Sequence, residues 1–254
     1  MSYSISVVVP VFNSEQTLEE LSTRLVTVLN TLTADFEILL VDDGSRDRSF
    51  EKMQRIQTGD ERIKLLKLAG NFGQQNALLC GLRHTSKEIV ITIDDDLQHP
   101  PEELPKLVAK IAEGYQAVFG VPYDKKHRRY RNLGTKLTGW LLNRISQKDK
   151  SLKSSSFRAL NREVVENIIE YQDSFVYLAP LIFGVTDKVT NIMVSHQPRH
   201  YGRSNYNLIR LLKLFLNLIF YYSKYLSWVP VRRNKKPQYV VEKTIWDKTQ
   251  GVGR

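Results

Sequence analysis

Hydrophobic residues along the chain form two kinds of pattern. Largely apolar runs, typical of strands buried on both faces, lie at 5–13, 36–41, 88–93 and 117–120, and the first of them runs into a Pro/Asn turn. Apolar residues at helical spacing follow it, namely Leu18, Leu21, Leu25 and Val28, and a helix is also expected after 36–41. Alternating strands and helices predict an α/β fold with a mostly parallel sheet.

Carboxylates follow two of the predicted strands directly. The run at 88–93 ends in Asp94-Asp95-Asp96, and the run at 36–41 ends in Asp42-Asp43. The carboxyl ends of parallel strands open onto one edge of the sheet, where open α/β sheets bind their ligands. Adjacent anions repel one another, and hard oxygen ligands suit Mg²⁺ or Mn²⁺ held together with substrate phosphates. Taken alone, Asp-Asp-Asp is equally compatible with a solvated loop.

Composition indicates one globular catalytic domain with appendages. The chain has 254 residues, of which 42% are hydrophobic and 25% charged, so it can bury one sizeable core and is not expected to be disordered. Its single cysteine, Cys80, lies in an apolar helical segment and is expected to be a buried thiol. Met1 leads directly into a strand, so no signal peptide is expected and a reducing cytoplasm fits.

Charge is distributed unevenly along the chain. Residues 199–254 hold twelve Lys or Arg and two acids, which accounts for the whole net charge of +10. Nucleic acid and an anionic membrane surface are the two partners that a basic segment can bind. The sequence before this segment contains equal numbers of basic and acidic residues, so the charge belongs to the C-terminal quarter.

Residues 207–229 favour the membrane over nucleic acid. On a helix, Arg210, Lys213 and Lys224 form a narrow cationic stripe beside a wide apolar face, and the longest uncharged run is shorter than the ~20 residues that cross a bilayer. We expect an interfacial helix rather than a transmembrane one, with the basic cluster at 232–236 adding affinity for anionic lipid. The side chains expected to insert are Phe215, Ile219, Tyr222 and Trp228. A core helix packed on the sheet is the alternative.

A second basic stretch follows the strand at 117–120. Residues 124–136 contain six Lys or Arg and one acid. Arg131 and Thr135 lie four positions apart, on one face of a helix that is predicted by Leu133, Leu137, Trp140 and Leu141. This stretch could seat an anionic group, and a solvated basic loop is the alternative.

Five segments together resemble the family 2 glycosyltransferases, which use nucleotide-sugar donors on a GT-A (Rossmann-like) fold. The segments are Val8–Asn13, Val41–Ser45, Asp94–Glu102, Phe157–Arg158 and Pro198–Tyr206, within a similarity that covers roughly residues 4 to 225. The last two segments and Gln98 point to the branch that glycosylates polyprenyl phosphates, such as dolichol-phosphate mannose synthases and bacterial undecaprenyl-phosphate sugar transferases.

The resemblance implies a role for each matching residue. Pro10, Phe12 and Asp42 would line the base and ribose pocket with Asp43 beside them, and Asp94 would approach the ribose or donor sugar. Asp96 and Gln98 would hold Mg²⁺ or Mn²⁺, and Arg199 and Arg203 would close over the donor phosphates. The acceptor phosphate would be taken by Arg131 and Thr135, with Arg128 and Arg129. Asp94, Asp96 and Arg131 would therefore be the catalytic residues. Two positions depart from the pattern, because Ser14 and Pro122 stand where relatives often carry an acid and an arginine. His99 and His196 are assigned no catalytic role.

The expected function is metal-dependent, inverting transfer of a sugar from a nucleotide donor, expected to be UDP-linked, to a polyprenyl phosphate such as undecaprenyl phosphate. The protein would act in cell-envelope polysaccharide biosynthesis as a peripheral protein at the cytoplasmic membrane face. The domain would span 1–206, with a nucleotide-sugar half to about 120 and an acceptor half after it, followed by the helix at 207–229 and a basic tail at 230–254. Nucleic acid is not an expected partner, and homo-oligomerisation is left open.

Two rival functions remain. A glycosyltransferase that extends a polysaccharide or lipid-linked glycan would need a general base to remove a hydroxyl proton, whereas a lipid phosphate is already ionised at pH 7. Asp95 is the one acid of the central motif without an assigned role. A nucleotide-sugar-binding protein without turnover is the rival outside the enzymes.

Overall fold

The computed structural model describes residues 3–123, 152–198, 217, 221–222 and 237–246. Its strands and helices, in chain order, are β1 (Ile5–Val11), α1 (Leu18–Leu32), β2 (Phe36–Asp42), α2 (Ser49–Gly59), β3 (Ile63–Leu68), α3 (Gln74–Arg83), β4 (Ile89–Thr92), the 3₁₀ turn η1 (Pro101–Glu103), α4 (Leu104–Ala112), β5 (Ala117–Pro122), β6 (Arg158–Asn161), α6 (Arg162–Ile169), α7 (Leu178–Val185), β7 (Val189–Val194) and β8 (Val241–Ile245).

The strands form one eight-stranded sheet in the order β7-β5-β6-β4-β1-β2-β3-β8. The central strands β4, β1, β2 and β3 run parallel, and so do β5 and β7. Strand β6 is antiparallel to both β4 and β5, and β8 is antiparallel to β3. The mostly parallel α/β sheet expected from the sequence is therefore confirmed, with one antiparallel strand inside the sheet, β6, and one at its edge, β8.

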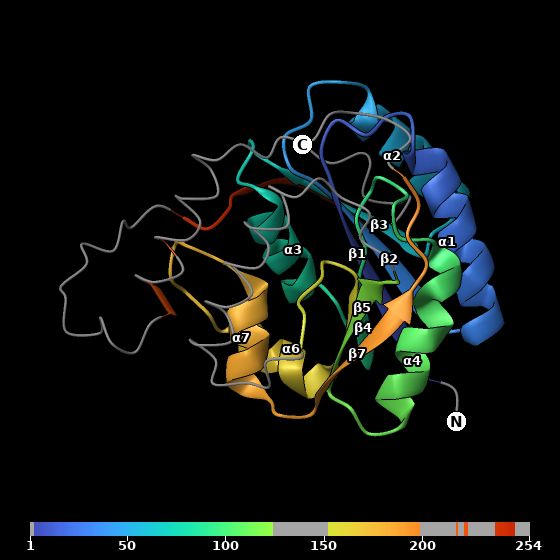
Figure 1. Ribbon diagram of the computed structural model, residues 1–254. Coiled ribbons are helices and arrows are strands. Elements are labelled where there is room, and N and C mark those ends of the chain that lie inside the picture. The colour runs from blue at the N-terminus through green and yellow to red at the C-terminus, as the bar shows by residue number, and fades with distance from the viewer. Residues whose placement is uncertain (1–2, 124–151, 199–216, 218–220, 223–236, 247–254) are drawn as a thin grey trace.

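Helices cover both faces of the sheet. In Figure 1, α1, α2 and α4 lie on one side of the strands, and α3, α6 and α7 lie on the other. Alternate residues of β1 enter two separate cores, because Val7 and Val9 pack with α1 and α4 while Val8 packs with α3 and α6. This two-sided burial explains why β1 and β2 are almost entirely apolar up to Asp42. Their polar exceptions, Ser6 and Glu37, are buried and bind each other at 2.6 Å.

Helix α3 approaches β1 very closely through a glycine. A Cβ atom added to Gly81 would lie 2.3 Å from Cγ1 of Val8, well inside contact distance. Any side chain there would push α3 away from the sheet. The residue thus sets the distance between the sheet and the helix whose first turn enters the candidate site described below.

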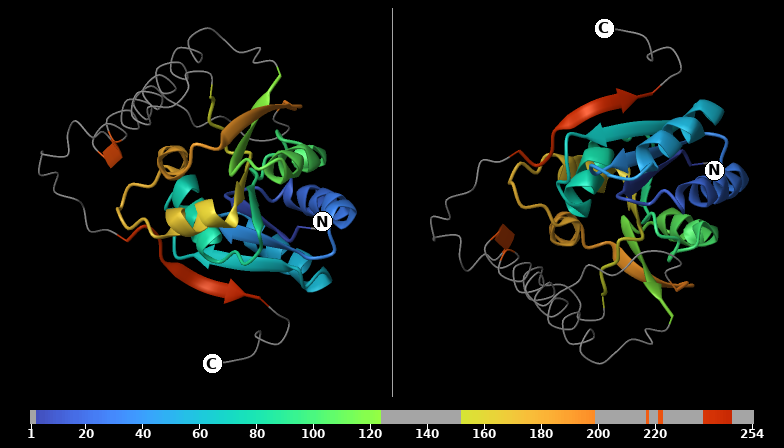
Figure 2. Two further views of the ribbon diagram at one scale, coloured as in Figure 1. Left: turned by 90° about the horizontal axis from the view of Figure 1, so that it is seen from below. Right: turned by 90° about the horizontal axis from the view of Figure 1, so that it is seen from above.

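Strand β8 adds an element that the sequence pattern did not predict. It lies along β3 at the edge of the sheet (Figure 2), the Val240 carbonyl accepts a hydrogen bond from Ala69 N at 2.8 Å, and Lys67 pairs with Glu242 at 2.8 Å. Part of the segment that was assigned to a basic tail is therefore integrated into the sheet. The sequence pattern did not indicate this strand because Val241–Ile245 contains three consecutive polar residues and, as an edge strand, has no fully buried residue.

The interfacial helix predicted at 207–229 lies outside the described residues except for positions 217, 221 and 222. At Tyr222, the hydroxyl accepts a hydrogen bond from Tyr177 N at 3.0 Å and donates one to the Phe175 carbonyl at 3.3 Å, and the ring stacks on Tyr171. The expectation that Tyr222 inserts into a bilayer is wrong, because its hydroxyl finds hydrogen-bond partners on the protein. Within the described part of the chain, no helix is long and apolar enough to span a membrane.

Candidate active site

Three parallel strands, β4, β1 and β2, end side by side, and their carboxyl ends form the edge of the sheet where the candidate site lies. Strand β1 lies between β4 and β2, and its last residue, Val11, is in register with Asp42. The segments that follow these strands are therefore neighbours in space, although they are far apart in sequence. They begin at Phe12, Asp43 and Ile93, and they carry the acids singled out in the sequence.

The turn after β1 is held in a conformation that is uncommon for residues other than glycine. Asn13 has a φ of 54°, in the left-handed region where asparagine is enriched. Its backbone N–H donates to Ser45 Oγ at 3.0 Å, and its side-chain oxygen accepts from Arg46 N at 2.8 Å. The turn after β1 is thereby bound to the turn after β2. Pro10 is buried within β1, while the ring of Phe12 is 38% exposed at the edge of the sheet.

Asp42 and Asp43 are both buried but differ in their contacts. Asp43 accepts hydrogen bonds from Phe72 N at 2.7 Å and Gly73 N at 2.9 Å, and burial raises its pKa to about 6. One oxygen of Asp42 accepts from Ser45 N at 3.1 Å, whereas Oδ2 has no hydrogen-bond partner among the described residues. Burial also raises the pKa of Asp42. Asp43 therefore shapes the loop before α3, whereas Asp42 holds a buried acceptor that no described residue satisfies.

Asp94 is oriented from two sides. Gln74 Nε2, in the first turn of α3, donates to Oδ1 at 2.6 Å, and the Ser156 hydroxyl donates to Oδ2 at 2.5 Å. Thr92 in turn donates to the Ser156 carbonyl. Sequence reasoning missed both Gln74 and Ser156, because neither belongs to the acidic motif. Gln74 follows Gly73 at a helix start, which was the one local signal available for it.

A buried cation lies behind this carboxylate. Arg158 is 3% exposed, its Nε donates to Thr92 Oγ1 at 3.2 Å, and its guanidinium lies over the Phe119 ring at 5.7 Å from the centroid. Burial lowers its pKa to about 10, so it remains charged at neutral pH, and attraction to Asp94 opposes that shift. The motif Phe157–Arg158 thus contributes positive charge next to the acids.

Asp95 faces the turn after β1. Its Oδ2 accepts hydrogen bonds from Phe12 N at 3.0 Å and from the Ser14 hydroxyl at 2.5 Å, and its backbone carbonyl accepts from Thr17 Oγ1 at 2.6 Å. Burial raises the pKa of Asp95 to about 7. The acid that the sequence left without a role is therefore bound to the first motif.

Asp96 and Gln98 lie in a tight loop. Gln98 N donates to Asp96 Oδ1 at 3.1 Å, and the intervening Leu97 is buried with a φ of 59°. The Gln98 carbonyl accepts from Gln197 N at 2.9 Å, so the segment that leads into Arg199 lies against this loop. The next residue, His99, stacks on the Phe157 ring, and the His196 ring lies edge-on to the His99 ring. The ring centroids are 5.0 Å apart in each pair.

The oxygen donors of this loop suit a hard divalent cation. No group of three or more His, Cys, Asp or Glu side chains in the described part of the chain is arranged to hold a metal. Mg²⁺ does not require such a cluster, since one or two carboxylates together with substrate phosphates commonly hold it. The carboxylate of Asp96 and the amide of Gln98 fit that mode of binding.

The sheet edge gathers Pro10, Phe12, Asp42, Asp43, Asp94, Asp96 and Gln98, the expected donor and metal residues that the structure describes. The other expected residues, Arg128, Arg129, Arg131, Thr135, Arg199 and Arg203, lie outside the described residues. Their assignments to the acceptor and donor phosphates stay predictions.

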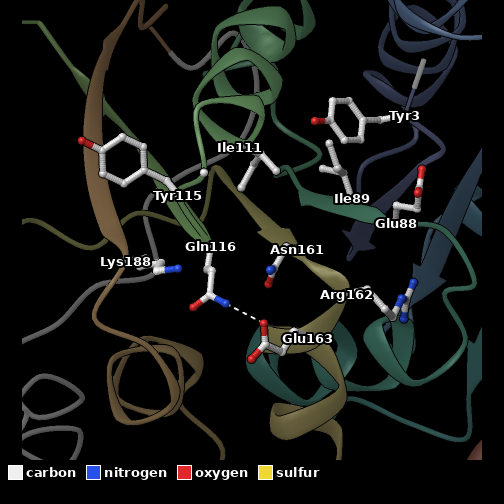
Figure 3. A pocket seen from close by; sticks show the side chains of 11 residues that line it. Tyr3, Glu88, Ile89, Ile111, Tyr115, Gln116, Asn161, Arg162, Glu163 and Lys188 are labelled. Atoms are coloured by element: carbon white, nitrogen blue, oxygen red, sulfur yellow. Dashed lines mark hydrogen bonds between the residues drawn. The ribbon is translucent and has the colours of Figure 1, made fainter. Parts of the chain in front are cut away.

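A hollow of about 450 Å³ lies at the other end of the strands, near the amino ends of β4, β5 and β7 (Figure 3). Its lining includes Ile89 at the start of β4 and Gln116 and Lys188 just before β5 and β7. Figure 3 shows Gln116 donating to Glu163, at 2.6 Å. Other polar side chains of the lining bind groups outside it, such as Arg162 with the Lys87 carbonyl and Glu88 with Ser4. The hollow contains none of the motif acids, so we do not assign it to the reaction.

The solved structures that resemble this fold include glucosyl-3-phosphoglycerate synthase from Mycobacterium tuberculosis. Its complex with Mn²⁺, UDP and glucosyl-3-phosphoglycerate matches with a TM-score of 0.64 and 21% identity, over 85% of this chain and 77% of that one. Another structure of the same enzyme, in complex with phosphoglyceric acid, matches with the same TM-score and identity. At this identity the match shows the fold alone, and the GT-A-like fold expected from the sequence is confirmed.

Sequence comparison identifies closer relatives. The undecaprenyl-phosphate 4-deoxy-4-formamido-L-arabinose transferases of Salmonella choleraesuis and Salmonella typhimurium are each 35% identical to this chain over 216 residues. The match covers 85% of this chain and 66% of each relative, so the chain spans just under two thirds of their length. The model of glycosyl transferase family 2 matches residues 6–169, and with these relatives it shows that the chain belongs to that family.

Proposed function

We propose that the chain transfers a sugar from a nucleotide-sugar donor, expected to be UDP-linked, to a polyprenyl phosphate of the undecaprenyl phosphate class, with inversion at the transferred carbon. The observation that carries the proposal is the meeting of Asp42, Asp94, Asp96 and Gln98 at one sheet edge in a family 2 chain. The named relatives support the acceptor, because they are undecaprenyl-phosphate sugar transferases. Glucosyl-3-phosphoglycerate synthase, which has a similar fold, has been solved with UDP and Mn²⁺, and this supports a UDP-linked donor.

Asp96 and Gln98 would hold Mg²⁺ or Mn²⁺ on the donor diphosphate. When bound, such an ion stabilises the negative charge that develops on the departing nucleoside diphosphate. Asp94 is held by Gln74 and Ser156, so it would meet the ribose or the donor sugar in a fixed orientation. Phe12 and Asp42, on the neighbouring strand ends, would border the base and ribose.

The contacts of Asp95 favour a phosphate acceptor over a hydroxyl acceptor. A transferase that extends a glycan needs a carboxylate or histidine to remove the hydroxyl proton. Of the motif acids, Asp94 is bound by Gln74 and Ser156, and Asp95 by Phe12 and Ser14. A lipid phosphate needs orientation and a cationic seat, for which Arg128, Arg129, Arg131 and Thr135 are our candidates.

Transfer to lipid is the direct test. The protein should convert a radiolabelled UDP-sugar into an organic-extractable glycolipid on vesicles that contain undecaprenyl phosphate, in the presence of Mn²⁺ or Mg²⁺. A panel of nucleotide sugars would identify the donor. Label that enters only a glycan acceptor would support the rival transferase, and binding of nucleotide sugar without any transfer would support a non-catalytic protein.

Arg131 tests the acceptor assignment. Loss of a charge-assisted contact to phosphate costs about 1.5–3 kcal/mol, so Arg131→Ala should lower the acceptor-dependent rate roughly ten- to a hundredfold. The affinity for UDP, measured by calorimetry, should stay unchanged. Weakened UDP binding with normal use of the acceptor would move Arg131 to the donor site.

A further inference from the structure

Asp95 joins two segments that are far apart in the sequence. Its carboxylate oxygen Oδ2 binds the backbone of Phe12 and the side chain of Ser14, and its carbonyl binds Thr17. The three contacts span 83, 81 and 78 residues of sequence. All of them connect the loop after β4 to the segment between β1 and α1.

The turn that Asp95 binds is also fixed from its other side. Ser45, in the loop after β2, accepts from Asn13 N, and Ser49 Oγ, at the start of α2, accepts from Ser14 N at 2.8 Å. The segment after β2 therefore holds the turn as well. The turn therefore lies between two acid-bearing loops, with hydrogen bonds to each. The Phe12 ring is exposed at this junction, and its backbone N–H is the group that Asp95 binds.

We propose that Asp95 is a positioning residue for the nucleotide donor: it fixes Phe12 and the turn after β1 relative to Asp94 and Asp96, so that the base pocket and the metal loop form one rigid unit. This inference rests on the proposed function, since it takes the donor to bind at this edge. Ser14, which departs from the family pattern, takes part as the hydroxyl donor to Asp95.

The role needs a hydrogen-bond acceptor and not a base. Both side-chain contacts of Asp95 end on the single oxygen Oδ2. An asparagine amide oxygen can accept the same two hydrogen bonds, but the amide cannot remove a proton from an acceptor hydroxyl. Asp95→Asn therefore keeps a positioning role and abolishes a general-base role, so it separates the two. Asp95→Ala abolishes both roles.

The experiment measures UDP affinity in the presence of Mn²⁺ by calorimetry, together with kcat and donor KM. We expect Asp95→Asn to stay within about threefold of the wild-type protein in all three quantities, since its acceptor is retained. We expect Asp95→Ala to weaken UDP binding and raise donor KM about tenfold or more, with a smaller change in kcat. A merely structural role would lower thermal stability without this split between KM and kcat.

Ser14→Ala keeps the test decisive if Asp95→Ala does not fold. It removes one of the two side-chain hydrogen bonds and should weaken UDP binding about threefold or more with an unchanged melting temperature. Thr23→Ala, which removes an exposed hydroxyl on α1, is the matched control and should change neither UDP binding nor the melting temperature. In the double variant of Ser14 and Asp95, the effects should combine to less than their product, because they remove the same contact.

Three outcomes would contradict the proposal. Asp95→Asn as inactive as Asp95→Ala would show that the carboxylate acts by its charge or as a base. Normal UDP binding by both Asp95→Ala and Ser14→Ala would show that the turn does not need Asp95. A wild-type protein that binds no UDP would overturn the proposed donor, and the role of Asp95 with it.

Discussion

Asp96 carries the most consequential negative charge in the proposed mechanism. Asp96→Asn removes a charged metal ligand with almost no change in volume, and the side chain is half-buried, so the fold should persist. Transfer should fall by at least about a hundredfold, because charge stabilisation by a metal is worth several kcal/mol in such reactions. The measurement is turnover at limiting Mn²⁺, with circular dichroism as the check on folding. A variant with near-wild-type turnover would remove Asp96 from the metal site.

The raised pKa of Asp43 makes the free energy of unfolding depend on pH, and it fixes the direction of that dependence. Its pKa is about 6 in the folded protein, against an ordinary value of 3.8, because it is buried. As pH rises, the unfolded chain loses this proton first, so the contribution of Asp43 to the free energy of unfolding falls between about pH 4 and 6 and is flat above.

The corresponding measurement is denaturant unfolding of the wild-type protein and Asp43→Asn at pH 4.5 and 7. The stability of the wild-type protein relative to the variant should be about 2 kcal/mol lower at pH 7 than at pH 4.5. An equal difference at the two pH values would show that the pKa of Asp43 is not raised. Because both proteins share every other carboxylate, the subtraction isolates this group.

At the scale of elements, the segment before β8 fastens the C-terminal end of the described chain to α3. Gln238 is 8% exposed, its amide nitrogen donates to the carbonyls of Tyr171 and Asp173, and its oxygen accepts from Arg83 at 2.7 Å. Gln238→Ala leaves buried polar groups without partners and should lower the free energy of unfolding by about 2–3 kcal/mol. Lys243→Ala, on the exposed part of β8, is the control and should change it by less than about 0.5 kcal/mol. Equal effects in denaturant unfolding would contradict an anchoring role.

The elements that the sequence predicted are those with a strong local pattern. Strands β1, β2, β4 and β5 are apolar runs, and α1 has a clear apolar face, so each was read from its own residues. Strands β3, β6 and β7 were missed because they are short or partly polar, and their pairing with other strands decides their state. Gln74 and Ser156 were missed for the same reason, since each contacts Asp94 only after α3 and the segment before β6 have packed on the sheet.

At the scale of the whole molecule, the acidic sheet edge contrasts with a C-terminal quarter that carries the entire net charge of +10. A lipid acceptor stays in its membrane, so the enzyme must come to it. We therefore propose that residues 207–236 bind an anionic bilayer as a peripheral element. Tyr222 is excluded from the inserting side chains by its contacts with Phe175 and Tyr177.

Vesicle sedimentation tests this proposal. Attraction of Arg and Lys to anionic lipid is screened by salt, with a Debye length of about 10 Å at 0.1 M, whereas insertion of Phe215, Ile219 and Trp228 is not. High salt should therefore loosen binding to anionic vesicles without eliminating it. Basic residues near an anionic surface contribute about 1 kcal/mol each, so charge reversal at Lys213 and Lys224 should weaken binding at least about thirtyfold.

Two further variants separate insertion from packing on the protein. Replacing Phe215 and Ile219 with Asp should release the protein into the supernatant, since apolar side chains supply the part of binding that salt does not screen. Tyr222→Phe should leave vesicle binding unchanged while it lowers stability, because its hydroxyl binds Phe175 and Tyr177. If the wild-type protein did not sediment with anionic vesicles at low salt, this segment would be better understood as part of the protein core, and the peripheral-membrane proposal would be abandoned.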